Sequence, residues 1–206
     1  MGRIKALLPH PDGSGRSWIE ATAGTLLASG LDPLFVVLGS AHRDIGSALD
    51  RFGGRVRRIR NPQWESGMLS SLQAGIRRVG EETDAAWALV APTDQPFLSV
   101  DLVRRLLAAT TGAGRARPAA VVPATATMEA RGSWGLPVVL HRRLFSEVLA
   151  LTPRPDGPDR GAGRLLARHR KDLITVPATP RELLDVDTSE ESRSLLDNPP
   201  NPCHER

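Results

Sequence analysis

Asp94 is the carboxylate best placed for chemistry in this sequence. The apolar run from Ala85 to Val90 ends at the turn Ala91-Pro92-Thr93-Asp94-Gln95-Pro96. A side chain at the carboxyl end of a buried parallel strand faces the crevice where ligands bind in open α/β sheets. An acid there is suited to hold Mg2+, a hard ion that prefers oxygen ligands and bridges to substrate phosphates. The alternative is a purely geometric role in an Asx turn or a helix N-cap.

A polar loop rich in small residues precedes that strand. Residues 61–75 read Asn-Pro-Gln-Trp-Glu-Ser-Gly-Met-Leu-Ser-Ser-Leu-Gln-Ala-Gly and lead into a helix. Gly67 permits close approach of a ligand to the backbone, and Ser70 and Ser71 offer hydroxyls and amides. We therefore predict that the loop reads a base or a ribose by hydrogen bonds. Trp64 is expected to anchor the loop in the core rather than to stack on a base.

A second acidic cluster runs from Asp185 to Glu191. In an extended segment the side chains of Asp185 and Asp187 face the same side. Ser189, Glu190 and Glu191 are typical of a helix start, where acids interact favourably with the helix dipole. Glu190 and Glu191 are therefore interpreted as solvated charges. For Asp187 the sequence leaves two roles, a metal ligand or a helix cap.

Two N-terminal features could contact phosphates. Lys5 is one of only two lysines in the chain, and its ammonium could stabilise charge that develops in phosphoryl or nucleotidyl transfer. A solvated lysine near the chain terminus explains it equally well. The segment from Asp12 to Ser17 precedes a helix and could cradle an anion with its amides. It has no Gly-Lys-Ser/Thr, so a plain turn before a helix is the simpler interpretation.

The remaining pattern alternates short apolar strands with helices, which favours a three-layer, doubly wound, mostly parallel α/β sheet. Predicted strands cover residues 34–38, 55–60, 85–91, 119–123, 134–140 and 173–176, with 55–60 near an edge. Predicted helices cover residues 17–29, 70–79, 99–107, 143–151 and 164–169.

Length and composition limit the classes of protein. The 206 residues suit a single domain over 1–197, followed by a disordered, Pro-rich tail over 198–206. No apolar run approaches the roughly 20 residues of a membrane span, and the single Cys203 forms no internal disulfide, so we expect a cytoplasmic protein. Arginines are scattered, aromatics make up 4% and tyrosine is absent, which argues against a nucleic-acid binder.

In chain order these residues resemble the MobA-like nucleotidyltransferase family, especially its molybdenum cofactor cytidylyltransferase branch. The likeness extends from residue 1 to about 195, and the ordered combination is specific although each piece is weak. The matching pieces are Met1-Gly2-Arg3-Ile4-Lys5-Ala6-Leu7-Leu8-Pro9, residues 27–39, Asn61 to Leu72, Asp94-Gln95-Pro96, Gly135-Leu136-Pro137-Val138 and Asp185-Val186-Asp187-Thr188.

The resemblance implies transfer of a nucleoside monophosphate from a nucleoside triphosphate to a phosphorylated acceptor such as molybdopterin, with release of pyrophosphate. The nucleoside monophosphate that it favours is CMP. It implies Mg2+ as cofactor, and a molybdoenzyme as a further partner. Lys5 matches the family lysine that contacts the triphosphate, Asp94 the magnesium-holding aspartate, and Asp187 a late position near the same metal. Asn61, Ser70 and Ser71 match positions near the nucleotide and the acceptor.

The sequence departs from the family pattern twice. Family members carry Ala-Ala-Gly-x-Ser-x-Arg before Met-Gly, after a first strand, whereas this sequence begins at that Met. Either residues upstream supply that strand and loop, or Ile4 to Leu8 serve as the first strand and Asp12 to Ser17 as a substitute loop. Leu136 stands where the family often has His. The alternative to an active transferase is an impaired homologue that binds a nucleotide or cofactor for delivery to a partner enzyme.

Overall fold

The strands of this protein form two separate sheets. The structure is a computed structural model that describes residues 4–111, 118–153 and 161–186. Its strands are β1 (Leu34–Leu38), β2 (Val56–Arg60), β3 (Trp87–Val90), β4 (Ala120–Ala124), β5 (Val138–His141) and β6 (Leu173–Pro177). Its α-helices are α1 (Trp18–Ala28), α2 (His42–Ala48), α3 (Met68–Glu82), α4 (Val100–Ala108), α5 (Ala126–Ala130), α6 (Phe145–Leu149) and α7 (Gly163–Arg168). The 3-10 helices are η1 (Lys5–Leu7), η2 (Asp50–Arg55), η3 (Trp64–Ser66), η4 (Ala109–Thr111), η5 (Arg142–Leu144) and η6 (Arg170–Asp172).

β1 and β2 form a parallel pair, in which Leu34 lies opposite Val56 and Leu38 opposite Arg60. The second sheet has the order β3-β5-β4-β6. In it β4 and β6 are parallel, whereas β5 is antiparallel to both β3 and β4. The predicted α/β class is confirmed, and β2 is an edge strand as expected. The division into two sheets was not predicted.

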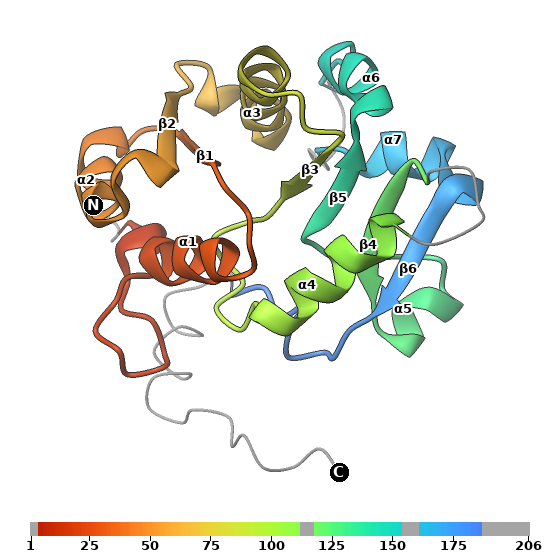
Figure 1. Cartoon of the computed structure of the whole chain (residues 1–206), viewed down its shortest axis with the longest axis horizontal. Helices are drawn as coiled ribbons and strands as arrows, with labels where there is room; N and C mark the ends of the chain where they lie inside the picture. Colours follow the sequence, from red (N-terminus) through yellow and green to blue (C-terminus); the bar gives the residue numbers. More distant parts are fainter. Residues whose placement is uncertain (1–3, 112–117, 154–160, 187–206) are drawn as a thin grey trace.

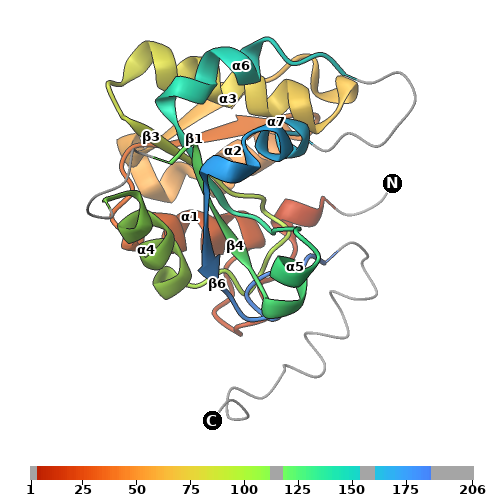
Figure 2. The same cartoon turned by 90° about the vertical axis from the view of Figure 1, so that its right-hand side faces the viewer.

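Helices cover both faces of the four-stranded sheet, which gives three layers (Figures 1 and 2). The cause is the two-residue alternation of side chains along each strand. Ala120 and Val122 of β4 pack in one cluster with residues of α3, α6 and α7. Val121, between them, packs on the opposite face with Leu102 and Leu106 of α4.

Local signals explain where the helices that flank the site begin. Ser17 and Glu20 form a capping box at α1: the Glu20 carboxylate accepts from the Ser17 amide at 2.7 Å. At α4, Ser99 accepts from the Leu102 amide at 3.0 Å. α3 starts at Gly67, whose φ of 101° is a backbone conformation that favours glycine. No helix in the described ranges combines the length and apolar character needed to cross a membrane.

Several local predictions are wrong. Ile4 to Leu8 is not a strand: amides of Leu7 and Leu8 donate to carbonyls of Ile4 and Lys5, which closes the 3-10 turn of η1. Leu7 packs instead into a cluster with Ile19 of α1. The helices α2 and α5 were not predicted either, because both are short, with seven and five residues.

Candidate functional site

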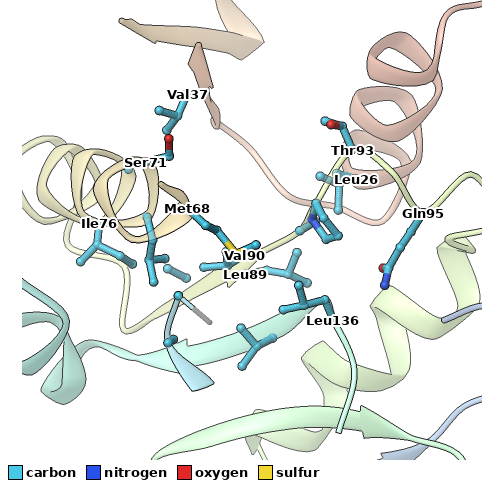
Figure 3. Close-up of a pocket in the computed structure, with 18 of the residues that line it drawn as sticks. Leu26, Val37, Met68, Ser71, Ile76, Leu89, Val90, Thr93, Gln95 and Leu136 are labelled. Carbon is cyan, nitrogen blue, oxygen red and sulfur yellow. The ribbon is translucent and has the colours of Figure 1, made fainter. Parts of the chain in front are cut away.

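A cavity of about 1120 Å3 lies between β1 and β3. Figure 3 shows Val37 of β1, Met68 and Ser71 of α3, and Leu89 and Val90 of β3 around the same space. α1 borders it on another side, and most of its lining is aliphatic. The polar side chains of the lining include Ser71, Thr93, Asp94, Gln95 and Asp185.

Asp94 lies in the loop that follows β3, as predicted, and it is part of the cavity wall. Its carbonyl oxygen accepts a hydrogen bond of 3.0 Å from the amide of Val186. Its neighbour Gln95 is only 2% exposed and donates through Nε2 to Asp185 Oδ1 at 2.9 Å. The loop of Asp94 and the segment that leads to Asp187 are therefore adjacent. Asp187 itself lies outside the described residues.

The N-terminal segment reaches the same loop through His10. His10 Nε2 lies 2.7 Å from the carbonyl oxygen of Pro96. Leu8, Trp18 and Val186 form a small buried cluster next to it. The segments around His10, Asp94 and Val186 thus converge, although Lys5 in η1 is not among the residues that line the cavity.

Asn61 acts as the hub of a hydrogen-bond network. It is 4% exposed, and its Nδ2 donates to Ser70 Oγ at 2.9 Å and to Ser71 Oγ at 3.0 Å. Its Oδ1 accepts from the Gln63 amide at 2.9 Å, and its own amide donates to the carbonyl of Leu38. Both polar atoms of the side chain are therefore used within the protein. The network fixes the start of α3 against the end of β1.

The other predicted loop residues divide between scaffold and cavity. The Ser70 hydroxyl lies 2.8 Å from the carbonyls of both Gln63 and Gly67, which makes it part of the turn before α3. Ser71 borders the cavity. Trp64 is 41% exposed, so the prediction of a core anchor is wrong. It packs instead on Gly39, where an added Cβ would lie 3.0 Å from the Trp64 Cβ.

The turn from Asp12 to Ser17 is held together by the side chain of Asp12. Asp12 accepts from the Ser14 amide at 2.9 Å and from Arg16 Nη2 at 2.8 Å. Burial raises the pKa of the Asp12 carboxyl, but hydrogen bonds from Ser14, Arg16 and His10 outweigh it and hold that pKa well below its usual range. The negative charge of Asp12 occupies the turn, which makes it a poor substitute for a phosphate-binding loop.

Carboxylates near the cavity are the residues that could hold a metal ion. Asp94 and Asp185 offer oxygen ligands of the kind that Mg2+ and Mn2+ bind. Within the described ranges no group of three or more His, Cys, Asp or Glu side chains could hold a metal by itself. A site with one or two carboxylates fits Mg2+, which usually keeps several waters and binds substrate phosphates as well.

Comparison with known proteins identifies the family of the chain. The model of the MobA-like NTP transferase domain matches residues 1–173. The chain belongs to this family. The MobA-like chain is thus a nucleotidyltransferase by family, which agrees with an acid at the end of a strand beside a cavity. No curated protein sequence matches it.

Solved structures with a similar fold include a nucleotidyl transferase and a cytidylyltransferase. Rv0371c from Mycobacterium tuberculosis H37Rv shares 24% identity, with 96% of this chain and 90% of that chain covered and a TM-score of 0.73. A second structure of Rv0371c is a complex with manganese. The nucleotidyl transferase Mth528 from Methanothermobacter shares 26% identity, with coverage of 94% and 83% and a TM-score of 0.71. The 2-C-methyl-D-erythritol 4-phosphate cytidylyltransferase of Thermus thermophilus shares 18%, with coverage of 95% and 93% and a TM-score of 0.63.

Three parts of the site were not predicted from the sequence. His10 and Gln95 act through contacts with residues far away in the chain, which no local spacing reveals. The cavity itself depends on how two strands are placed in space. One signal was available: Gln95 directly follows Asp94 at the end of a buried strand, where side chains face the ligand crevice.

Proposed function

We propose that this MobA-like protein transfers a nucleoside monophosphate from a nucleoside triphosphate to a phosphorylated small-molecule acceptor such as molybdopterin. CMP is the nucleoside monophosphate that the proposal favours. The observation that carries the proposal is the position of Asp94, which borders the cavity while its backbone binds Val186. Family membership supplies the reaction class. The cytidylyltransferase with the same fold makes CTP the first donor to test.

In this reaction an oxygen of the acceptor phosphate attacks the α-phosphorus of the triphosphate. A new P–O bond forms, the bond between the α-phosphorus and the bridging oxygen breaks, and pyrophosphate leaves. The protein contributes mainly positioning and neutralisation of charge. Mg2+, when bound, supplies positive charge to the phosphate oxygens.

The proposed roles combine the family resemblance with the contacts of the described residues. Asp94 and Asp187 hold the metal, supported by the hydrogen bond between the Asp94 carbonyl and the residue before Asp187. Lys5 contacts the triphosphate, and Ser71 at the cavity contacts the nucleotide or the acceptor. A second group of residues from the same loop fixes the geometry of that contact: Asn61, Gly67 and Ser70.

The test is pyrophosphate release with CTP, GTP, ATP or UTP, Mg2+ and molybdopterin. We expect Asp94→Asn to lower kcat about 100- to 1000-fold, because loss of metal-assisted charge stabilisation costs several kcal/mol and each 1.36 kcal/mol is tenfold. Asp84→Asn is the matched control, since Asp84 is an exposed acid that precedes the same strand. The assay is run on the printed chain and on a longer form that includes the residues encoded directly before Met1. Absence of release with every triphosphate in both forms would refute the proposal.

One observation favours the delivery alternative: Lys5 is not among the cavity-lining residues. A protein that only holds a nucleotide or cofactor for a partner, such as a molybdoenzyme, does not need that ammonium at the phosphates. Calorimetry with CTP separates the two functions. For the transferase we expect binding to weaken when Mg2+ is removed and in Lys5→Ala, whereas unchanged binding in both cases would favour delivery.

A further inference from the structure

The loop that carries Asp94 is held from two sides by residues far away in the chain. On one side, the amide of Val186 donates to the carbonyl of Asp94 at 3.0 Å. On the other side, Nε2 of His10 lies 2.7 Å from the carbonyl oxygen of Pro96, across a separation of 86 positions in the sequence. Pro96 is buried. The contact with His10 therefore fixes the loop just after the carboxylate that borders the cavity.

The partners of the His10 imidazole determine which nitrogen carries the proton. A carbonyl oxygen only accepts, so Nε2 must carry a hydrogen in order to bind Pro96. In the neutral ring Nδ1 is then an acceptor, and the amide of Asp12 lies 3.3 Å from it. In the protonated ring Nδ1 is a donor as well, and the carboxylate of Asp12 lies 3.0 Å from it. The hydrogen bond to Pro96 is thus kept in both charge states of His10.

The turn at residues 12–17 gives His10 a fixed backbone. The amide of His10 donates to the carbonyl of Arg16 at 2.8 Å, and Pro9 forms an antiparallel bridge with Ser17. A side chain on a backbone that is already ordered loses little further freedom when it makes a contact. The turn, which is a poor site for a phosphate, is therefore well suited to hold an imidazole in place.

His10 acts on the loop and not on a substrate. Its side chain is 11% exposed, both of its ring nitrogens have partners within the protein, and it is not among the residues that line the cavity. Thr93, Asp94 and Gln95 do line the cavity, and they come directly before Pro96. A displacement of Pro96 therefore also displaces the carboxylate two residues before it.

We propose that His10 is a positioning residue for Asp94, an inference that rests on the metal role of Asp94 in the proposed function. The hydrogen bond from His10 to Pro96 sets the position in which the Asp94 carboxylate binds a divalent cation. Loss of a partner that orients a metal ligand typically weakens metal binding about 10- to 100-fold. His10 reaches the carboxylate through two residues of backbone, so the lower end of that range applies.

Three substitutions of His10 separate its two contacts. His10→Leu removes both of them. In His10→Gln the amide nitrogen is the same number of bonds from Cβ as Nε2 of histidine, so it can still donate to Pro96. In His10→Asn the amide nitrogen corresponds to Nδ1 instead, so only the contact with Asp12 is kept. If the bond to Pro96 positions the loop, His10→Gln should resemble the wild type and His10→Asn should resemble His10→Leu.

Electron paramagnetic resonance of added Mn2+ measures metal binding without turnover. We expect the Kd for Mn2+ to rise about 10-fold in His10→Leu and His10→Asn, and less than about 2-fold in His10→Gln. If His10→Leu fails to fold, the comparison of the other two variants decides the result. An equal Kd in His10→Asn and His10→Gln would overturn the proposal.

His169→Leu is the matched control for the loss of a histidine contact. Nε2 of His169 lies 3.0 Å from the carboxylate of Glu147, and His169 does not line the cavity. This variant should lower the melting temperature but leave the Kd for Mn2+ unchanged. If it weakens Mn2+ binding as much as His10→Leu does, general destabilisation explains both effects and the positioning role is wrong.

Amide NMR spectra recorded without metal separate this proposal from the proposed function. In His10→Leu and His10→Asn we expect the amide signals of Asp94 and Gln95 to shift, while those of α6 stay in place. Unshifted loop signals would overturn the role of His10, whatever the Mn2+ titration gives. Asp94→Asn with the Mn2+ affinity of the wild type would instead refute the metal role of Asp94. Shifted loop signals in His10→Leu would then show that the failure lies in the proposed function and not in the contact of His10.

Discussion

Replacing Asn61 with alanine tests whether this buried amide is a scaffold residue or a nucleotide ligand. The change removes three side-chain hydrogen bonds, to Ser70, Ser71 and the Gln63 amide. At about 0.5–1.5 kcal/mol for each bond, we expect the free energy of unfolding to fall by about 1.5–4.5 kcal/mol. For a domain of this size each kcal/mol corresponds to about 2–4 °C, so the melting temperature should fall by roughly 3–18 °C.

The assay combines thermal unfolding with nucleotide kinetics. Gln63→Ala is the control for the same loop, because its exposed side chain is outside the network and surface changes usually stay within about 0.5 kcal/mol. Asn61→Asp keeps the acceptor for the Gln63 amide but loses the donor to both serines, so it should fall between wild type and Asn61→Ala. An unchanged melting temperature in Asn61→Ala, together with a raised KM for the triphosphate, would refute the scaffold role.

Two further changes address the ends of helices near the site. Gly67→Ala should lower the free energy of unfolding by about 1–3 kcal/mol in urea titrations, because φ 101° and ψ −175° lie in a region open almost only to glycine. Gly54→Ala, where no heavy atom lies within 4 Å, should be nearly neutral, and an equal loss in both variants would contradict the backbone explanation. Burial raises the pKa of the Glu20 carboxyl. Hydrogen bonds from Ser17 and Arg51 and the charge of Arg51 outweigh that effect, so the pKa of Glu20 is lower in the folded protein than in the unfolded chain. Its stabilising effect is therefore present above the unfolded value of about 4.3 and is lost as the pH falls, and Glu20→Gln should destabilise the protein at pH 6 much more than at pH 3.

The strand and helix positions were largely predictable from local pattern. The apolar run of β1 appears in the sequence, and the predicted helices 17–29 and 99–107 start at Ser17 and Ser99, the N-caps of α1 and α4 in the structure. The prediction of a strand from Ile4 to Leu8 is wrong, because a short apolar segment forms a strand only beside a partner strand. Here its backbone closes a turn instead.

The position of Asp94 beside a cavity was predictable from the sequence, and the contacts around it were less so. Asp94 borders a cavity, as its place after β3 indicated. The proximity of the segments around His10, Asp94 and Val186 depends on long-range packing, which local periodicity does not report. The division of the strands into two sheets could not be predicted from local pattern either, because strand order depends on the whole fold.

The small cluster of Leu8, Trp18 and Val186 has a consequence for synthesis in the cell. Chains fold from the N-terminal end as they emerge from the ribosome, and domains tend to fold as units. Leu8 and Trp18 emerge early but obtain their partner only when Val186 has left the exit tunnel. The loop of Asp94 also waits for the Val186 amide, so the site should be among the last parts of the nascent protein to become ordered.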